Sequence, residues 1–378
     1  MRILLTTDTL GGVWTFTKEL TTELLNRGHA VALVSFGRQP SHEQQTWCAS
    51  LHLAHGDNFQ FTASNAPLEW MEKNEFVFKQ GAGVLFNVAR HFRPDLLHTN
   101  QFCFGALTLD IPKLITAHTD VLSWAHACRP RGLEDCRWLR QYRCLITHGL
   151  HGCDALVTPT RWLATALLQH YKSLPLCYVV PNGRKLSAPQ GQMRSLQAMT
   201  VGRLWDEAKN IEVLRNVNSP VPIYVAGERQ HGESVAPKQM GRAILLGALP
   251  ESSLMSMFAR SSIYIATSIY EPFGLAPLEA ALCGCAVVAN DIPSLREVWG
   301  DAALYFNGAH SLSTVLHQLN RDPRRLSTLR QQAFLRASEL TAERMTNGYE
   351  EIYWSLLAGR MGIRPLAEVQ PGFAAHAA

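Results

Sequence analysis

The chain has 378 residues, which is too long for one ordinary domain and fits two domains of about 150 to 200 residues each. Hydrophobic residues make up 47% and charged residues 17%, a balance that excludes extended disorder. The net charge of +4 is too small to indicate nucleic-acid binding. No apolar run reaches the roughly 18 to 20 residues that span a bilayer, and the first residues lack the zones of a signal peptide, so we expect a cytoplasmic protein.

The first forty residues predict a β-α-β unit. An apolar strand at residues 2–7 runs into Gly11 and Gly12, and a helix with apolar residues four apart ends at Gly28, before a second strand at residues 30–35. A glycine turn after the first strand is typical of a Rossmann-like α/β domain. Further strands are expected at residues 95–98, 113–118, 155–159 and 177–181.

A polar stretch that runs from Pro181-Asn182-Gly183 to Gln197 predicts a linker. A second alternating series follows, with a helix at residues 251–260 and strands at residues 198–202, 222–227, 243–247, 262–268 and 286–290. Two doubly wound parallel sheets joined by a linker imply a cleft lined by the carboxyl ends of their strands. We therefore predict one domain over residues 1–181 and another over residues 182–342. A helix at residues 343–358 is long enough to cross back onto the first domain, and residues 359–378 are expected to form a loose tail.

Nine cysteines are scattered from Cys48 to Cys285 without the paired CxxC spacing of zinc or redox sites, so we expect reduced thiols. Cys283 and Cys285 are expected to be buried small hydrophobic residues. The sequence predicts no metal site and no cofactor.

The segment EPFGLAPLE, which begins at Glu271, follows an apolar strand and is predicted to open a helix at Pro272. A diphosphate would fit against the backbone amides of Gly274 and Leu275, at the positive end of that helix. Glu279, about two turns further on, suits the two hydroxyls of a ribose, while Glu271 can reach the sugar beyond the phosphates. The alternative is an ordinary proline-initiated helix with two solvated glutamates.

The segment VGRLWDEAKN places Arg203 and Lys209 just after the first strand of the second domain. Both cations can reach the same diphosphate. Cleavage of a nucleotide sugar leaves about one extra negative charge on the departing diphosphate, and fixed cations stabilise that charge as a metal ion does elsewhere. By itself, this segment also fits a solvated turn.

Together these features resemble the family-4 retaining glycosyltransferases of the GT-B fold, over almost the whole chain. The matching features are, in order, the Gly11-Gly12 loop, the strand that ends at His118, PNG at residues 181–183, GRL with Lys209, the pair Glu271 and Glu279, and a crossing terminal helix. The resemblance implies an acceptor-binding first domain, a donor-binding second domain, and retention by front-face displacement, in which the leaving phosphate accepts the acceptor's proton.

The resemblance also implies roles for single residues. Gly12 would approach the donor across the cleft, and His118 would bond the outer hydroxyl of the sugar, although a histidine of this kind is by itself more often part of a core. The implied catalytic set is His118, Arg203, Lys209 and Glu271. The implied donor site is Gly11, Gly12, Arg203, Lys209, Gly227, Leu249, Glu271, Phe273, Gly274, Leu275 and Glu279.

The donor's base is expected to contact mainly backbone around Gly227 and Leu249, so residue identity does not reveal it, and UDP is our expectation ahead of GDP and ADP. No acidic DxD triplet occurs in the chain, so we expect metal-independent chemistry. Two rival functions share the architecture: a nucleotide-sugar epimerase, which would need acid and base residues at C2 of the sugar, and a binding module without activity.

On the acceptor side we expect Trp14, Trp124 and His126, since flat aromatic rings suit sugars, although they suit a hydrophobic core equally well. The acceptor would be a carbohydrate, a lipid-linked or a small molecule. Residues 129–143 hold five arginines, which fit a solvated helix face or weak contact with anionic lipid headgroups. The oligomeric state is left open.

Two segments depart from the family pattern. Arg184 and Lys185 follow PNG where the family often has an apolar residue and an aspartate, and residues 268–270 read SIY rather than a glycine-rich stretch.

Overall fold

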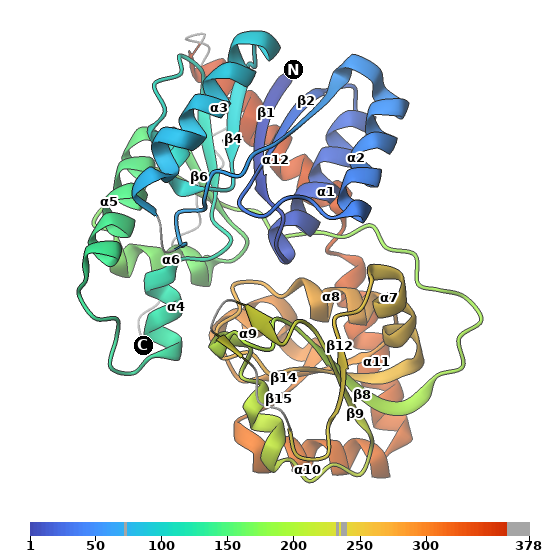
Figure 1. Ribbon diagram of the computed structural model, residues 1–378. Coiled ribbons are helices and arrows are strands. Elements are labelled where there is room, and N and C mark those ends of the chain that lie inside the picture. The colour runs from blue at the N-terminus through green and yellow to red at the C-terminus, as the bar shows by residue number, and fades with distance from the viewer. Residues whose placement is uncertain (72–73, 232–233, 236–239, 361–378) are drawn as a thin grey trace.

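The computed structural model describes residues 1–360 except 72–73, 232–233 and 236–239. Of the tail predicted over residues 359–378, the first two residues belong to the last helix, which ends at Arg360, and the rest lie outside the described residues. The first domain is built on a seven-stranded parallel sheet in the order β3-β2-β1-β4-β5-β6-β7 (Figure 1). Its strands are β1 (Arg2–Asp8), β2 (Ala30–Phe36), β3 (Phe59–Ala63), β4 (Leu96–Thr99), β5 (Lys113–Thr116), β6 (Ala155–Thr158) and β7 (Leu176–Val179).

Helices cover both faces of this sheet, as a doubly wound fold requires. They are α1 (Gly12–Asn26), α2 (His42–His55), α3 (Val77–Phe92), α4 (Val121–Cys128), α5 (Arg137–Gly152) and α6 (Arg161–His170). The central strands β1 and β4 are buried apart from the first residue of β1, because helices pack on each side of them.

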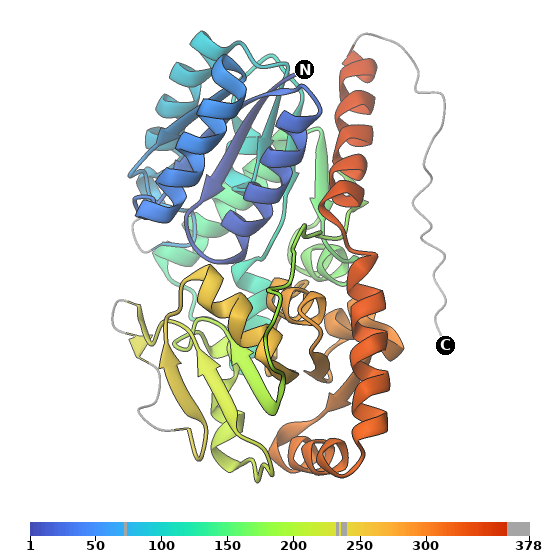
Figure 2. The same ribbon diagram turned by 90° about the vertical axis from the view of Figure 1, so that its right-hand side faces the viewer.

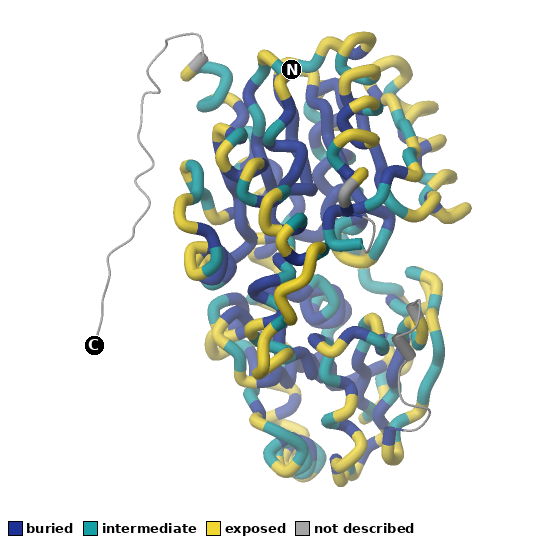
Figure 3. Tube along the Cα trace, turned by 60° about the vertical axis from the view of Figure 1, so that its left-hand side comes forward, coloured by how far each residue is buried: buried dark blue, intermediate teal, exposed yellow. Residues whose placement is uncertain are grey.

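The second domain is built on a six-stranded parallel sheet in the order β12-β9-β8-β13-β14-β15. Its strands are β8 (Ser195–Val201), β9 (Ile223–Ala226), β12 (Ile244–Gly247), β13 (Ser261–Ala266), β14 (Ala286–Asn290) and β15 (Ala303–Phe306), and its helices are α7 (Glu251–Arg260), α8 (Leu275–Leu282), α9 (Pro293–Trp299), α10 (Gly308–Arg321) and α11 (Pro323–Ser338). Figure 3 shows the buried strands inside each domain and the exposed residues mostly on the outer helices and loops.

The predicted class, two Rossmann-like α/β domains with parallel sheets, is confirmed. Four of the described strands were not predicted: β3, β15, and the two-residue strands β10 (Gln230–His231) and β11 (Ser234–Val235), which pair with each other. β3 mixes polar residues with phenylalanine and is partly exposed at an edge, and β15 is a four-residue edge strand. β3 lacks the continuous apolar run of a central strand, whereas β15 (ALYF) is apolar throughout but short. Among the described residues, no helix is long and apolar enough to cross a membrane. The nine cysteines are free, and Cys283 and Cys285 are buried as expected.

The polypeptide passes between the two sheets at two adjacent places. After β7 it turns at Gly183, and after α11 it returns at Thr341 into α12 (Ala342–Arg360). A Cβ atom on Gly183 would lie 2.0 Å from the carbonyl oxygen of Thr341, so only glycine fits there. Figure 2 shows α11 along the second domain and α12 along the first, nearly end to end.

Helix α12 completes the core of the first domain. Tyr349 and Tyr353 are buried among residues of β1, β2 and α1. The Tyr353 hydroxyl lies 2.6 Å from Nδ1 of buried His98, whose Nε2 lies 2.7 Å from the Thr116 hydroxyl. Burial, together with the nearby His118, lowers the pKa of His98 to about 3, so this imidazole stays neutral.

We expect the substitution Tyr353→Phe to lower the free energy of unfolding by about 1 to 3 kcal/mol, because it leaves a buried nitrogen of His98 without a partner. Urea denaturation measures this change. Glu351→Gln, on the exposed side of the same helix, is the control and should change stability by less than about 0.5 kcal/mol. Equal stability of the two variants would show that the His98 contact contributes nothing.

Candidate active site

Two helix N-termini, one from each domain, face each other between the domains. Helix α1 begins at Gly12 and helix α8 begins at Leu275. A Cβ atom on Gly12 would lie only 3.4 Å from Cδ1 of Leu275, so the two helix starts are in close contact. Neither helix has a side chain that caps its first turn, because the N-cap residues are Gly11 and Gly274. The free amides of both first turns therefore carry positive partial charge into one place.

The start of α8 differs from the prediction. The helix begins at Leu275 rather than at Pro272, and Glu279 lies about one turn into it rather than two. The reason is the backbone of Gly274, whose φ of 91° lies in the left-handed region and cannot belong to a right-handed helix. Proline still sits in the first turn, as Pro277, where its missing N–H has no helical partner to lose.

Lys209 and Glu271, predicted from separate segments, form an ion pair. Lys209 lies in the loop after β8, and Glu271 precedes α8 by a short turn. The Ser268 hydroxyl also donates to Glu271, at 3.0 Å. Both charged side chains are about one-fifth exposed, so a ligand between the domains can reach them.

Arg203 lies on the same loop as Lys209 and pairs with Asp206 at 2.7 Å. Asp206 also accepts a hydrogen bond of 3.2 Å from the indole of Trp124, which belongs to the first domain. The positive charge of Arg203 also acts on Asp8, at the carboxyl end of β1, and lowers its pKa. Burial raises the pKa of Asp8 to about 6, against the opposing effects of its hydrogen bond from the Leu10 amide and of Arg203.

His118 follows β5 and is held by Asn100. The Asn100 amide nitrogen donates to the carbonyl of Thr6 at 2.6 Å, so its carbonyl oxygen faces Nε2 of His118 at 2.8 Å. That oxygen can only accept, hence Nε2 of His118 carries the proton and Nδ1 is left as an acceptor. Burial lowers the pKa of His118 to about 3 and keeps the ring neutral. The ring can therefore accept a hydrogen bond from a hydroxyl group.

Glu279 is buried beside Arg184, the residue that departs from the family pattern. Nε of Arg184 lies 2.9 Å from Oε1 of Glu279, as an ion pair without the alignment of a hydrogen bond. The same guanidinium donates to Glu19 of α1 and, at 2.9 Å, to Glu251 of α7. Arg184 thus joins carboxylates from both domains.

Tyr270 lies in residues 268–270, the second segment that departs from the family pattern, and it also connects the two domains. Its hydroxyl accepts hydrogen bonds from the Thr119 hydroxyl at 3.1 Å and from the Asp120 amide at 3.2 Å. These donors directly follow His118, and Tyr270 directly precedes Glu271. The tyrosine therefore fixes the distance between the histidine loop and the Glu271 loop.

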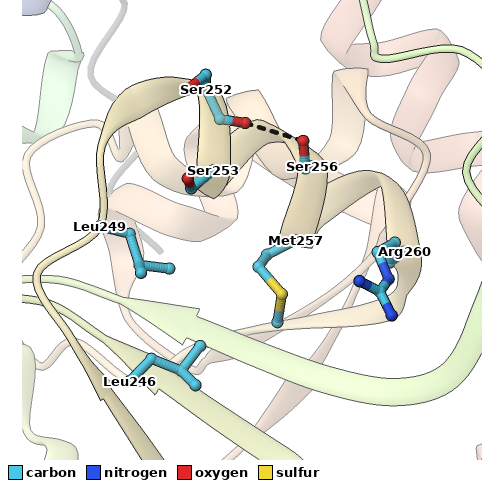
Figure 4. Close-up of a pocket in the computed structure, with 7 residues that line it drawn as sticks. All are labelled: Leu246, Leu249, Ser252, Ser253, Ser256, Met257 and Arg260. Atoms are coloured by element: carbon cyan, nitrogen blue, oxygen red, sulfur yellow. Dashed lines mark hydrogen bonds between the residues drawn. The ribbon is translucent and has the colours of Figure 1, made fainter.

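The remaining donor-site candidates have structural surroundings of their own. Phe273 is buried in the core of the second domain. A Cβ atom on Gly227 would lie 1.7 Å from the carbonyl of Gly202, so close packing of two strand ends explains this glycine. Leu249 points into an open groove of about 410 Å³ between α7 and the β12 edge, together with Leu246 and Met257 (Figure 4). The groove is also lined by the polar side chains of Ser252, Ser253, Ser256 and Arg260.

The acceptor-side candidates do not lie together. Trp14 is buried and packs edge-on against Trp47 of α2, with ring centroids 5.4 Å apart. It therefore belongs to the hydrophobic core, the alternative to sugar binding. Trp124 contacts Asp206 across the domain interface, and His126 is exposed. Of the five arginines in residues 129–143, two are ion-paired, Arg129 with Glu207 and Arg140 with Asp135.

Sequence reasoning missed four residues of this region: Asp8, Asn100, Arg184 and Tyr270. Asp8 and Asn100 directly end or follow parallel strands, so the rule that placed His118 at the site also applied to them. Arg184 and Tyr270 stand at the two departures from the family pattern, to which the resemblance assigns no role.

Two family models match the chain, that of glycosyltransferase family 4 over residues 10–187 and that of glycosyl transferases group 1 over residues 208–334. The chain is 24% identical over 357 residues to an alpha-monoglucosyldiacylglycerol synthase of Streptococcus pneumoniae, which covers 83% of this chain and 77% of that one. It is 23% identical over 320 residues to a glycogen synthase of Mycobacterium tuberculosis, which covers 76% of each.

Solved structures are similar over almost the whole length. Sucrose-phosphate synthase of Thermosynechococcus elongatus has a TM-score of 0.77 at 16% identity, covering 95% of this chain and 100% of that one. HepE of Anabaena, in complex with UDP and glucose, has a TM-score of 0.71 at 18% identity, covering 94% and 100%. At these identities the structures establish the shared fold. The two family models match the first and the second domain in turn, and the fold is that of the similar structures. The chain therefore belongs to the family-4 glycosyltransferases with GT-B architecture.

Proposed function

We propose that this glycosyltransferase uses a UDP-sugar, retains the configuration of the transferred sugar and needs no metal ion. One observation carries the proposal: the uncapped N-termini of α1 and α8 meet between the domains, next to Arg203 and Lys209. Helix amides and cations together favour a diphosphate, and they are already in place before the charge develops.

The sugar would lie beyond the phosphates, between Glu271 and His118. Glu271 accepts from sugar hydroxyls, and the neutral His118 ring accepts one more hydroxyl through Nδ1. Glu271 is already neutralised by Lys209 and would act as a binding group rather than as a nucleophile. Retention would then proceed on one face of the sugar, with the leaving phosphate taking the proton of the acceptor hydroxyl.

The similar proteins support the choice of donor and leave the acceptor open. The HepE structure is a complex with UDP and glucose, and one relative is named for a glucosylated product. The names of the two relatives give glycogen, a carbohydrate, as one product and a glucosylated diacylglycerol, a lipid, as the other. We therefore propose a carbohydrate or lipid-linked acceptor and a cytoplasmic enzyme, with the exposed Arg137 and Arg143 of α5 available for weak contact with a membrane.

The first prediction from this proposal concerns metal ions. Turnover should be unchanged in excess EDTA, because Arg203, Lys209 and the two helix N-termini supply the positive charge that a metal would supply elsewhere. Product formation from a UDP-sugar, measured with and without EDTA, tests this. Activity that is lost with the chelator and restored by magnesium or manganese would contradict it.

The second prediction concerns stereochemistry. The product should carry the anomeric configuration of the donor, because the site holds its carboxylates for binding and the reaction would proceed on one face. The proton coupling at the new anomeric centre, measured by NMR, reports the configuration directly. An inverted centre would exclude the retaining mechanism.

The third prediction separates the two glutamates by Glu→Gln substitution. Glu279→Gln should raise the donor KM by roughly ten- to a hundredfold, since a charged acceptor for ribose hydroxyls contributes about 1.5 to 3 kcal/mol, and kcat should change little. Glu271→Gln should depress kcat more than it raises KM, because the sugar gains positive charge at the transition state.

Calorimetry with UDP serves as the control for this pair, since it reports binding without turnover. Normal UDP binding by Glu279→Gln together with impaired binding by Glu271→Gln would show that the two roles are wrongly assigned.

A further inference from the structure

We propose that Arg184 is a positioning residue for the donor: it holds the Glu279 carboxylate in place and in its charged form for the ribose. The inference rests on the proposed nucleotide site. It concerns a residue at which this chain departs from the family pattern, so the resemblance gives it no role.

Arg184 is suited to this task because both its backbone and its side chain are held by hydrogen bonds. Its side chain is 2% exposed, and its backbone amide donates to the carbonyl of Leu340 at 3.0 Å, where the chain passes between the domains. Two of its guanidinium nitrogens are taken by Glu19 and Glu251. The third, Nε, is left facing Glu279.

The contact supplies charge to Glu279 while leaving its hydrogen-bonding capacity free. Nε lies 2.9 Å from Oε1 of Glu279 but is not aligned for a hydrogen bond. Among the described residues, we find no hydrogen bond to the Glu279 carboxylate. A buried carboxylate with a counterion and unused lone pairs is prepared to accept two hydroxyl groups.

The surrounding charges explain why a counterion is needed. Burial raises the pKa of Glu279 to about 7, and Arg184 opposes this most strongly; Glu251 and Glu19 raise the pKa further, while Lys18 lowers it. Tyr264 and Cys283 also face Glu279 and stay neutral near pH 7, because burial raises the pKa of each. The cluster thus holds the three carboxylates of Glu19, Glu251 and Glu279 against the two cations of Arg184 and Lys18.

Solvent reaches the cluster from one side. Arg184, Glu19, Glu251 and Lys18 line a cavity of about 300 Å³ between α1, α7 and the linker. Protons can therefore exchange with Glu19 and Glu251, whose charges act on Glu279.

The test is the dissociation constant of UDP, measured by calorimetry from pH 6 to pH 9. The ribose prefers ionised Glu279, so UDP should bind more tightly as the pH rises through the pKa of Glu279. The phosphate of UDP and other groups of the protein, such as Asp8, titrate in or near the same range. Each profile is therefore divided by that of Glu279→Gln, which keeps all of these groups and lacks only the Glu279 carboxylate.

Two substitutions should shift this profile in opposite directions. Arg184→Met removes the main counterion of Glu279, so the rise in UDP affinity should move to higher pH. This variant should bind UDP roughly tenfold more weakly at pH 7, and its affinity should recover toward pH 9. Glu19→Gln removes a carboxylate that opposes ionisation, so the rise should move below that of the unmodified protein. Arg184→Lys keeps a charge and should lie between the unmodified protein and Arg184→Met.

Lys185→Met is the matched control. It removes one positive charge from the next position of the same loop, where the side chain is exposed and pairs with Glu23 rather than with Glu279. Its profile should match that of the unmodified protein.

The outcomes separate this inference from the proposed function. If the unmodified protein binds none of UDP, GDP and ADP, the nucleotide site itself is refuted. If it binds UDP but Arg184→Met and Arg184→Lys weaken binding by the same factor at every pH, Arg184 serves only the architecture and the inference is overturned. If Arg184→Met does not fold, Arg184→Lys and Glu19→Gln decide, and an unshifted profile in both overturns the inference.

Discussion

The constraint on which the structure depends is the close passage of two chain segments between the domains. Gly183 and Thr341 touch so tightly that no side chain fits between them. This contact fixes where one domain begins relative to the other, because both connections run through it. The carboxyl ends of two parallel sheets are thereby turned toward each other, and the starts of α1 and α8 come within van der Waals distance. A diphosphate site built from two helix N-termini is possible only in that arrangement.

The charged groups of the interface follow a common scheme. Lys209 is paired with Glu271, Arg203 with Asp206, and Arg184 with three carboxylates. These cations and anions, which the proposed function assigns to different parts of a ligand, neutralise each other, and this reduces the cost of burying them. Lysine and arginine have more donors than these pairs use, so a phosphate can bind without breaking every existing contact.

Much of the fold was predictable because it depends on local patterns. Apolar runs of four to seven residues marked most of the strands, and glycines marked the turn after β1 and the end of α1. Residues of the candidate site could be proposed from the sequence only where they follow a strand or precede a helix, as His118, Lys209 and Glu271 do. Arg184 and Glu19 are 165 residues apart in sequence, and Tyr270 and Asp120 are 150 apart. Contacts between residues so far apart leave no hydrophobic periodicity in either segment, so the sequence pattern could not predict them.

Helix α12 has a consequence for the order in which the protein can be made. Its residues Tyr349, Ile352 and Tyr353 fill the core of the first domain, yet they are synthesised after the entire second domain. At about 5 to 20 residues per second, the ribosome needs on the order of ten to thirty seconds to reach them after finishing β7. During that interval the emerging first domain exposes an apolar face and the polar edge of His98. A chaperone can bind the exposed face during this time, and the whole second domain is synthesised before the first domain can be completed.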